Sequence, residues 1–508
     1  MKKIKTALIS VWDKTDIIEF AQFLVKHNIQ ILSTGGTKKV LEKNNIEVTP
    51  ISEITNQKEI MNGRVKTLDP KIFGGILADR NNKNHIDDLE KMNSFCIDLV
   101  IVNLYPFKSE AIDKNLKILD SIEFIDIGGP SMLRAAAKNH ENVIPICDSK
   151  DYTKFKNIYN NNDGRIPAKE RLRFAAKVFK LTNSYDNLIY NYFSNQEESF
   201  SIHLDKDNDL RYGENPHQKS SFYLPDNESK QWKQISGKKL SYNNYFDIEA
   251  AISIVYEFSE LSCSIIKHSN PCGFAFGATP KEAYLRAVTV DPVSYFGGIV
   301  AFNYYVDSKV ALELDKSFLE CIVAPSFSKD AIEILSKKKN LRLIIIDKEK
   351  IISNNLSMKS VFNGYLLQDK DSTYDDENTF SVVSKIKPKK TELKALILGW
   401  KLVRYVKSNA IVFSNHKQLL GVGAGQMSRI DSTEIAINKA KKNGLKLNGA
   451  VMASDAFFPF SDCIQIASKQ GIKGVIHPGG SIKDKEIIKE VDKLKMFMII
   501  TNKRHFSH

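Results

Sequence analysis

Three polar side chains follow a short apolar stretch near the middle of the chain: Lys267, His268 and Asn270. A strand end that presents such groups is where an α/β enzyme often places its chemistry. The lysine could stabilise an oxyanion, and the histidine could move a proton near neutral pH. Pro271 and Gly273 are expected to turn the backbone here. Read alone, the same string is equally well explained as a plain strand-end turn.

A second group of residues suits an anionic ligand. Residues 33–37 read STGGT, between a predicted strand at 29–32 and a predicted helix at 38–44. Free backbone amides at a helix start attract anions, and glycines allow a phosphate to approach closely. Lys14, in the loop after the first predicted strand, can add a cation. An ordinary strand–helix turn remains the alternative for STGGT by itself.

The elements that must position these groups alternate between strand and helix. Residues 6–11 and 99–103 read as strands, and a helix is expected directly after the glycines at 128–129, with Pro130 at a first helical position. The apolar spacing that predicts a helix after the first strand is carried by Ile17, Phe20, Ala21, Leu24 and Val25. Repeated strand–helix units imply a mostly parallel sheet with helices on both faces.

Two polar stretches divide the chain. The stretch 195–209 predicts a boundary between a domain at 1–195 and a domain at 196–508. Within the second domain, the charged stretch 368–392 separates subdomains at about 200–367 and 392–508. It precedes a predicted helix whose apolar stripe comprises Leu393, Leu396, Trp400 and Val403. No internal repeat is evident between the subdomains.

Composition excludes several classes of protein. No apolar run is long enough to cross a bilayer, and the apolar residues 7–11 are too few for a signal peptide. The six cysteines form no CxxC pair, so neither a zinc knuckle nor a disulfide framework is indicated. A net charge of +13 could attract nucleotides, but runs such as 337–339 and 387–390 read as solvated faces. We expect a cytoplasmic protein that binds neither nucleic acid nor membrane.

Motifs in a fixed order extend over nearly the whole chain. They are STGGT (33–37), GRVKTL (63–68), NLYPF (103–107), IDIGG (125–129), AAAKNH (135–140), LRYGENPHQ (210–218), LSYNN (240–244), IIKHSNPCG (265–273), DPVSYFGGIVAFN (291–303), KSNAIV (407–412), GVGAGQMSR (421–429), SDAFFPFSD (454–462) and PGGSI (478–482). Together they resemble the bifunctional AICAR transformylase/IMP cyclohydrolase family. The resemblance implies an α/β fold, with a methylglyoxal-synthase-like parallel-sheet domain followed by a pair of cytidine-deaminase-like α/β/α subdomains.

The resemblance also implies two reactions of purine synthesis. In the N-terminal domain, FAICAR would close to IMP, with Lys138 moving protons, Lys66 and Tyr105 stabilising the oxyanion, and Asp126 orienting the amide. The expected nucleotide contacts there are Lys14, Thr34, Gly35, Gly36, Thr37, Arg64, Thr67, Asn103 and Ile127.

In the C-terminal domain, AICAR would take a formyl group from 10-formyltetrahydrofolate, without a catalytic metal. His268 would act as base, Lys267 would support the oxyanion and the leaving group, and Asn409 would add a hydrogen bond. The expected AICAR and folate contacts are Arg211, Tyr212, Gly297, Glu320, Arg429, Phe457, Asp462, Ser481 and Arg504. The resemblance further implies a homodimer in which Lys267 and His268 meet the later residues across the subunit interface.

Four residues depart from the family pattern: Trp12 replaces a small hydroxyl residue, and Asp69, Phe73 and Leu181 each replace a histidine. The sequence also argues against two other functions. A zinc deaminase needs HxE and PCxxC, which the string from His268 onward lacks. A dinucleotide site needs GxGxxG, which residues 421–425 do not match. A catalytically weakened regulatory protein that binds purine nucleotides is the remaining alternative.

Overall fold

The structure of the chain is a computed structural model that describes residues 3–57, 60–61, 64–194, 200–225, 228–346, 348, 356–371 and 375–508. The chain forms two compact units, Met1–His203 and Leu204–His508. Both the predicted boundary at 195–196 and Gly63 of the GRVKTL string lie outside the described residues.

The first unit is built on a parallel sheet with the strand order β3-β2-β1-β4-β5. All neighbouring pairs are parallel, as the strand–helix alternation predicts. Ala7 and Ile9 face one core and Leu8 the other, because successive side chains of a strand point to opposite faces. The strands are β1 (Thr6–Ser10), β2 (Gln30–Ser33), β3 (Thr49–Pro50), β4 (Leu99–Val102) and β5 (Ile144–Ile146).

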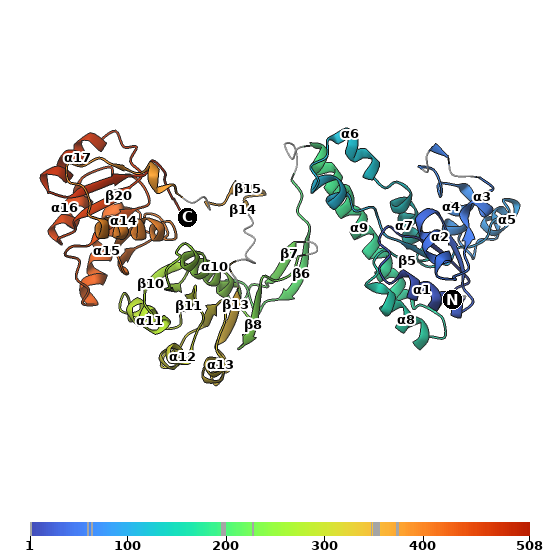
Figure 1. The fold of residues 1–508 in the computed structure, drawn as a ribbon, viewed down its shortest axis with the longest axis horizontal. Coiled ribbons are helices and arrows are strands. Elements are labelled where there is room, and N and C mark those ends of the chain that lie inside the picture. The colour runs from blue at the N-terminus through green and yellow to red at the C-terminus, as the bar shows by residue number, and fades with distance from the viewer. Residues whose placement is uncertain are drawn as a thin grey trace. The chain divides into compact units, whose positions relative to one another are not determined.

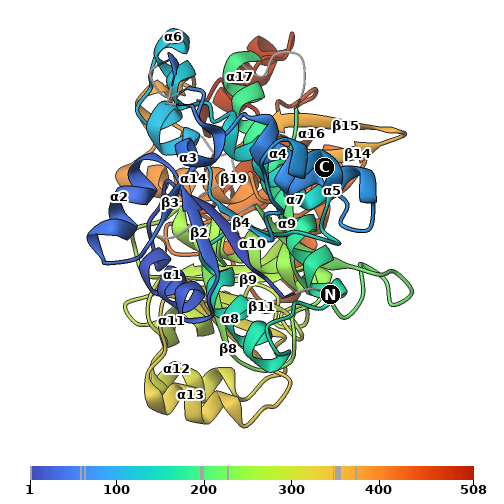
Figure 2. The same ribbon diagram turned by 90° about the vertical axis from the view of Figure 1, so that its right-hand side faces the viewer.

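Helices cover both faces of this sheet (Figure 2). Helices α1 (Ile17–Lys26), α2 (Gly35–Lys43) and α8 (Asp151–Asn161) pack on one face, and α4 (Pro70–Leu77), α7 (Gly128–Lys138) and α3 (Ile51–Thr55) on the other. The long α9 (Ala168–Ser194) reaches both cores, while α5 (Lys83–Lys91) and α6 (Ile118–Ser121) lie further out.

Three details of the first unit differ from the sequence-based predictions. Helix α2 begins at Gly35 rather than at residue 38, so the two glycines form its first turn. Helix α7 begins at Gly128, which makes Pro130 its third residue. Val25 was placed on the buried stripe of α1 but is 42% exposed.

The second unit contains two six-stranded mixed sheets, with the orders β10-β9-β11-β12-β13-β8 and β18-β17-β19-β20-β21-β16 (Figure 1). In both orders the neighbouring pairs run antiparallel, antiparallel, parallel, parallel and antiparallel. The strands of the first sheet are β8 (Trp232–Ser236), β9 (Ser262–Lys267), β10 (Asn270–Phe276), β11 (Ile299–Phe302), β12 (Cys321–Ala324) and β13 (Arg342–Ile346). Those of the second are β16 (Ser381–Val382), β17 (Ile411–Ser414), β18 (Leu419–Gly423), β19 (Val451–Ser454), β20 (Gly474–His477) and β21 (Phe497–Ile500).

The helices follow the same repeat. Helices α10 (Tyr242–Tyr256) and α14 (Lys390–Val403) share one core between the two sheets. The outer face of the first sheet carries α11 (Pro280–Val288), α12 (Ser308–Leu314) and α13 (Lys329–Ser336). The outer face of the second sheet carries α15 (Arg429–Lys442), α16 (Asp462–Lys469) and α17 (Asp484–Lys493). The unit is therefore a pair of α/β/α subdomains with one topology, a repeat that the sequence does not reveal. Leu393, predicted on the buried stripe of α14, is 37% exposed.

Two separate hairpins complete the second unit: β6 (Leu204–Asp209) with β7 (Ser221–Pro225), and β14 (Leu356–Val361) with β15 (Gly364–Asp369). The first packs on α10, where Phe222 stacks on Tyr245 with ring centroids 4.5 Å apart. The edge strand β10 also meets the turn that precedes β18, since the backbone N–H of Phe276 donates to the carbonyl of Lys417 at 2.9 Å. This contact brings one end of the first sheet to the second.

Candidate functional site

The first candidate site lies where the loops after β1, β2 and β4 meet at the carboxyl edge of the parallel sheet. Asn103 holds the loop after β1, because its Oδ1 accepts from the N–H of Asp13 at 3.1 Å and its Nδ2 donates to the carbonyl of Asp13 at 2.8 Å. The Oγ1 of Thr37 similarly lies 3.1 Å from the nitrogen and 3.0 Å from the carbonyl oxygen of Val11. A cavity of about 480 Å³ opens beside these loops, with Trp12 and Lys14 in its lining.

The start of α2 has the anion-binding geometry that STGGT predicts. Thr34 caps the helix in an extended conformation, and Gly35 opens it with a φ of 48°. A Cβ on Gly35 would stand 3.5 Å from Nζ of Lys66, so this ammonium lies over the first turn, while Gly36 has open space on its free side. Free N–H groups, the helix dipole and the lysine charge all favour a phosphate here.

Lys14 folds back onto its own loop. Its Nζ donates to the carbonyl oxygens of Val11 and Trp12, the second at 3.1 Å. Burial lowers the pKa of Lys14, and the neighbouring Asp13 opposes this shift. A phosphate in the cavity would have to draw the ammonium away from these carbonyls.

Asp126 sits at the start of α7, enclosed by backbone groups. Its Oδ1 accepts from the N–H of Gly129 at 2.9 Å, and a Cβ on Gly129 would stand 2.3 Å from its Oδ2, so only glycine fits there. Burial raises the pKa of Asp126, against hydrogen bonds from the backbones of Gly129 and Tyr105. Thr67 adjoins the same turn, with Oγ1 3.1 Å from the place of a Cβ on Gly128. A carboxyl group with a raised pKa is suited to give and take a proton.

Lys138 is not brought to this site. It is the last residue of α7, and an 11-residue helix is about 16 Å long at 1.5 Å per residue. Beside it, Nδ2 of Asn139 donates to the carbonyls of Ile76 and Ala78 at 2.8 and 3.0 Å, at the far end of α4. Thr67 precedes the start of α4 and meets the start of α7, so the two helices lie parallel and Lys138 emerges at their opposite end.

The other expected contacts of this site are more exposed. Arg64 pairs with Glu123 at the surface, and the side chain of Ile127 is 59% exposed. Tyr105 follows β4, and its ring centroid lies 4.9 Å from that of Trp12. Trp12 and Tyr105 together form an aromatic pair beside the cavity.

The second candidate site forms at the turn between β9 and β10. Lys267 pairs with Asn270, and the turn consists of His268 and Ser269, whose φ values of 52° and 59° are both left-handed. The expectation that Pro271 and Gly273 make the turn is wrong, since both lie within β10. A two-residue turn of this kind joins tightly paired antiparallel strands and leaves the imidazole exposed at its tip.

Lys267 faces a row of strand ends at one edge of the first sheet. Its Nζ donates to the carbonyl of Phe296 at 2.6 Å, and a Cβ on Gly297 would stand 3.8 Å from this nitrogen. The backbone of Glu320 continues the row with a 3.1 Å hydrogen bond to the carbonyl of Gly298, and its carboxylate pairs with Arg342. Lys267, Gly297 and Glu320 therefore lie side by side at the ends of the neighbouring strands β9, β11 and β12.

The loop 407–409 reaches this edge from the second sheet. Oδ1 of Asn270 accepts from the backbone N–H of Lys407 at 3.0 Å. Two residues on, Nδ2 of Asn409 donates to the carbonyl of Gln426 at 3.0 Å, and its Oδ1 accepts from Nη2 of Arg429 at 2.9 Å. The turn and the loop thus adjoin within one chain, so a subunit interface is not needed to join them.

The remaining expected contacts lie in two other places, one on the second sheet and one between β6 and β7. Phe457, Asp462, Ser481 and Arg504 follow β19, β20 and β21, at one edge of the second sheet. Phe457 is 39% exposed, whereas the next residue, Phe458, is buried. In the loop between β6 and β7, the guanidinium carbon of Arg211 lies 5.3 Å from the centroid of the Tyr212 ring.

Helix α10 links the Arg211 loop to the His268 turn. Nδ2 of Asn243 donates to the carbonyl of Glu214 at 3.2 Å, and Oδ1 of Asp247 accepts from the N–H of Ser269 at 2.6 Å. The two α10 residues are four positions apart and share one helix face. Both segments therefore lie on the same side of α10.

Residues 136–439 match the family described as AICARFT/IMPCHase bienzyme, and residues 16–131 match the family described as MGS-like domain. The chain is 47% identical, over 99% of its length, to bifunctional purine biosynthesis proteins PurH of Bacillus thuringiensis subsp. konkukian (strain 97-27) and Bacillus cereus (strain AH820), each covered in full. The chain belongs to the AICARFT/IMPCHase bienzyme family. It is a bifunctional enzyme of purine biosynthesis, an AICAR formyltransferase and IMP cyclohydrolase. A solved structure titled "Crystal structure of ForH" matches 38% of the chain and 100% of its own length, at 30% identity and a TM-score of 0.35.

Three of the four departures from the bienzyme pattern, Asp69, Phe73 and Leu181, have structural roles. Oδ1 of Asp69 accepts from the backbone N–H of Lys71 at 2.8 Å, which caps α4 next to Pro70. Phe73 and Leu181 pack against the core on the α7 side of the sheet. Asp69 thus supplies what the start of a helix needs, because a side-chain oxygen satisfies a free backbone N–H there.

Replacing Asp69 with alanine should destabilise the first unit by about 1 kcal/mol, the usual effect of removing a helix cap. Asp69→Asn keeps the acceptor and should cost much less. Chemical unfolding, followed by a probe in the first unit, measures the difference. Equal losses for the two variants would show that the carboxylate charge, rather than the cap, matters.

The structure does not support the alternative function of a zinc deaminase. Among residues that the structure describes, no group of three or more His, Cys, Asp and Glu side chains could hold a metal ion. All six cysteines are free. No helix in the described part of the chain is both long and apolar enough to cross a membrane.

Sequence reasoning missed several residues that shape the second site. Asp247 fixes the backbone of the turn from 22 residues away, and no local pattern marks it. The buried Asp455 pairs with Arg429, although it stands within the SDAFFPFSD string. Burial lowers the pKa of the nearby His477 to about 3, and Arg429 shifts it in the same direction, so this imidazole is neutral.

Proposed function

We propose that each unit carries one of the two reactions. Residues 204–508 transfer the formyl group of 10-formyltetrahydrofolate to AICAR, and residues 1–203 close the product, FAICAR, to IMP. The observation that best supports this division is the junction of the Lys267–His268 turn with the Asn409 loop, made by Asn270 within the second unit. The phosphate cradle at Gly35 and the carboxyl group of Asp126 belong to the first unit.

Formyl transfer starts from a weak nucleophile. The amino group of AICAR is conjugated with its ring, so a base must take its proton as the new C–N bond forms. His268, exposed at the tip of the turn, is that base. Lys267 stabilises the tetrahedral oxyanion and supports departure of the folate nitrogen. Its ammonium has three donors, so it can bind the substrate while it donates to the carbonyl of Phe296. Asn409 adds a hydrogen bond to the same centre.

The ligands of this reaction bind around the two sheet edges. Arg211 and Tyr212 hold the AICAR phosphate, where the planar arginine fork suits two phosphate oxygens. Phe457 packs on the pterin. Further contacts to nucleotide or folate come from Gly297, Glu320, Arg429, Asp462, Ser481 and Arg504.

Cyclisation needs attack of a carboxamide nitrogen on the formyl carbon, followed by loss of water. Lys66 and Tyr105 stabilise the developing oxyanion, and Asp126, with its raised pKa, orients the amide and exchanges its proton. The phosphate lies at the start of α2, among Lys14, Thr34, Gly35, Gly36, Thr37, Arg64, Thr67, Asn103 and Ile127. Proton transfer by Lys138 is kept as a hypothesis to be tested, because this side chain lies at the far end of α7.

The family's formyltransferase activity implies a folate co-substrate. Neither step uses a catalytic metal. The protein works in the cytoplasm on small molecules, as a homodimer, and binds neither nucleic acid nor membrane.

The hairpin β14–β15 supports the homodimer. It forms its own two-stranded sheet and extends away from the six-stranded sheets of the second unit (Figure 2). Its exposed side chains include Met358, Phe362, Tyr365, Leu366 and Leu367. An isolated hairpin is at best marginally stable in water, and clustered exposed apolar residues mark an interaction surface. A second copy of the chain is the proposed partner that buries these side chains.

Replacing Phe362 with asparagine and Tyr365 with lysine should weaken dimerisation at least about tenfold, because buried aromatic residues carry much of an interface's energy. Asparagine suits the φ of 53° at position 362. Sedimentation velocity over a concentration series gives the dissociation constant, and Leu312→Lys on α12 is the matched control for an exposed apolar residue. An unchanged dissociation constant in the double variant would exclude the hairpin from the interface.

The proposed function is tested by incubating purified protein with AICAR and 10-formyltetrahydrofolate. We expect release of tetrahydrofolate, seen by absorbance, and IMP as the end product. Binding of the nucleotides without turnover would favour the alternative, a weakened regulatory protein.

A further inference from the structure

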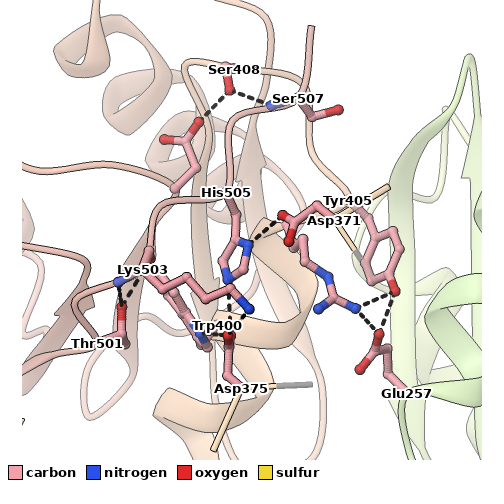
Figure 3. Close-up of polar contacts among 12 residues, drawn as sticks. Glu257, Asp371, Asp375, Trp400, Tyr405, Ser408, Thr501, Lys503, His505 and Ser507 are labelled. Atoms are coloured by element: carbon pink, nitrogen blue, oxygen red, sulfur yellow. Dashed lines mark hydrogen bonds and ion pairs between the residues drawn. The ribbon is translucent and has the colours of Figure 1, made fainter. Parts of the chain in front are cut away.

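The imidazole of His505 is held between two carboxylates (Figure 3). Its Nδ1 lies 2.5 Å from Oδ2 of Asp371, and its Nε2 lies 2.9 Å from Oδ2 of Asp375. An ionised carboxylate can only accept, so both ring nitrogens must carry a proton. His505 is 1% exposed, and the geometry therefore calls for a buried imidazolium.

Other charged and polar groups complete this cluster. Nε1 of Trp400 donates to Oδ2 of Asp375 at 2.6 Å, and Nζ of Lys503 lies 3.0 Å from Oδ1 of Asp375. Arg404, which pairs with the buried Glu257, adds its positive charge near Asp371. The carboxylates thus face three cations, and these contacts tie segment 501–508 to α14.

The same segment supports the loop that carries Asn409. The N–H of Ser408 donates to the carbonyl of Ser507 at 2.9 Å, and its Oγ accepts from the N–H of Ser507 at 3.1 Å. Nζ of Lys407 donates to the carbonyl of His508 at 2.8 Å. Segment 501–508 therefore lies along the loop 407–409 and holds it by its backbone.

A second connection runs through Asp455. The backbone N–H of His505 donates to the carbonyl of Asp455 at 3.1 Å. The carboxylate of Asp455 accepts from Oγ of Ser408 at 2.5 Å and pairs with Arg429, which donates to Asn409. Both routes lead from His505 to Asn409, and Arg504 is the neighbouring residue in the chain.

We propose that His505, in its doubly protonated form, is a positioning residue for formyl transfer, which holds Arg504 and the loop 407–409 in place for folate and AICAR. The inference rests on the assignment of Asn409 and Arg504 to the formyl-transfer site. His505 does not touch the substrate. It acts through the segment 501–508.

Because His505 must be charged, the positioning of Arg504 and the loop 407–409 should depend on pH in one direction. Burial alone would lower the pKa of His505, but the hydrogen bonds with Asp371 and Asp375 outweigh it and raise the pKa above the usual 6.5. For a group whose pKa is raised in the folded state, the stabilisation is complete below the unfolded pKa and is lost as pH rises through the folded pKa. Positioning should therefore weaken on the alkaline side.

The test compares the pH dependence of KM for formyl transfer in three proteins: the unaltered enzyme, His505→Gln and Asp371→Asn. In the unaltered enzyme, KM for 10-formyltetrahydrofolate should rise as His505 loses its proton. His505→Gln should raise KM at least about tenfold near neutral pH, as expected when charge-assisted hydrogen bonds are lost, and should flatten that alkaline rise. Asp371→Asn removes one carboxylate and should move the rise to lower pH, which a merely structural role would not do.

Two readouts keep the outcome clear. Cyclisation of added FAICAR, assigned to the other unit, should be unchanged in both variants, and His416→Gln, at an exposed histidine of the same subdomain, should leave both activities unchanged. If His505→Gln fails to fold, the KM profile of Asp371→Asn still tests the role of His505. An unaltered enzyme without formyl transfer would refute the proposed function. If the unaltered enzyme transfers the formyl group and Asp371→Asn shows the same dependence of KM on pH, the proposed role of His505 is overturned.

Discussion

Replacing His268 with asparagine or alanine is expected to slow formyl transfer by about 10²-fold or more, the usual contribution of a general base. Cyclisation of added FAICAR should continue at the unaltered rate, because its residues lie in the other unit. Lys267→Met should cause a similar loss by removing the charge that stabilises the oxyanion. Tetrahydrofolate release from 10-formyltetrahydrofolate and AICAR measures the first step, and IMP formation from FAICAR the second.

The choice of asparagine matters at this position. His268 has a φ of 52°, a conformation that asparagine adopts more readily than alanine. A loss seen only in His268→Ala would point to a distorted turn, whereas equal losses point to the missing imidazole. Lys309→Ala, an exposed lysine on α12, is the control for Lys267. Near-normal transfer in His268→Asn would contradict the proposed mechanism.

Cyclisation should fall by about 10²-fold or more in Asp126→Asn, because asparagine keeps an acceptor for Gly129 but cannot exchange the proton. Formyl transfer should be unaffected. Lys138→Ala provides the comparison. Since this lysine lies at the far end of α7, we expect it to lose much less cyclisation than Asp126→Asn.

Initial rates of IMP formation from FAICAR decide between these two residues. A folded Lys138→Ala protein that cyclises as slowly as Asp126→Asn would return proton transfer to Lys138. It would also contradict the placement of the site at the start of α7. Lys66→Met should resemble Asp126→Asn, because its ammonium lies over the first turn of α2.

The sequence predicts the parallel sheet of the first unit well, because alternation of apolar strands and amphipathic helices reflects the local geometry of each element. It does not reveal that β8–β13 and β16–β21 share one topology. Such a repeat needs only a similar order of buried segments, which very different residues can supply. Val25 and Leu393 were wrongly assigned to buried stripes, since spacing alone does not show how wide a buried face is.

The two sites also contain features that local sequence signals do not predict. Pro271 and Gly273 are strong turn signals, yet the turn falls on His268 and Ser269, where a distant carboxylate, Asp247, binds the backbone. Lys138 follows its small-residue helix in sequence, but sequence does not say which end of that helix faces the site. In contrast, the strings around Gly35 and Asp126 identify helix starts, where the chemistry of free N–H groups is local.

The central claim is that two independent sites in one chain perform consecutive reactions. It is tested most directly by mixing His268→Asn protein with Asp126→Asn protein and supplying AICAR and 10-formyltetrahydrofolate. Alone, the first variant should leave AICAR unconverted and the second should accumulate FAICAR. Together they should form IMP, because FAICAR released by one protein is cyclised by the other. If the Asp126→Asn protein accumulates no FAICAR, or the mixture forms no IMP although each variant is folded, the two-site account is contradicted.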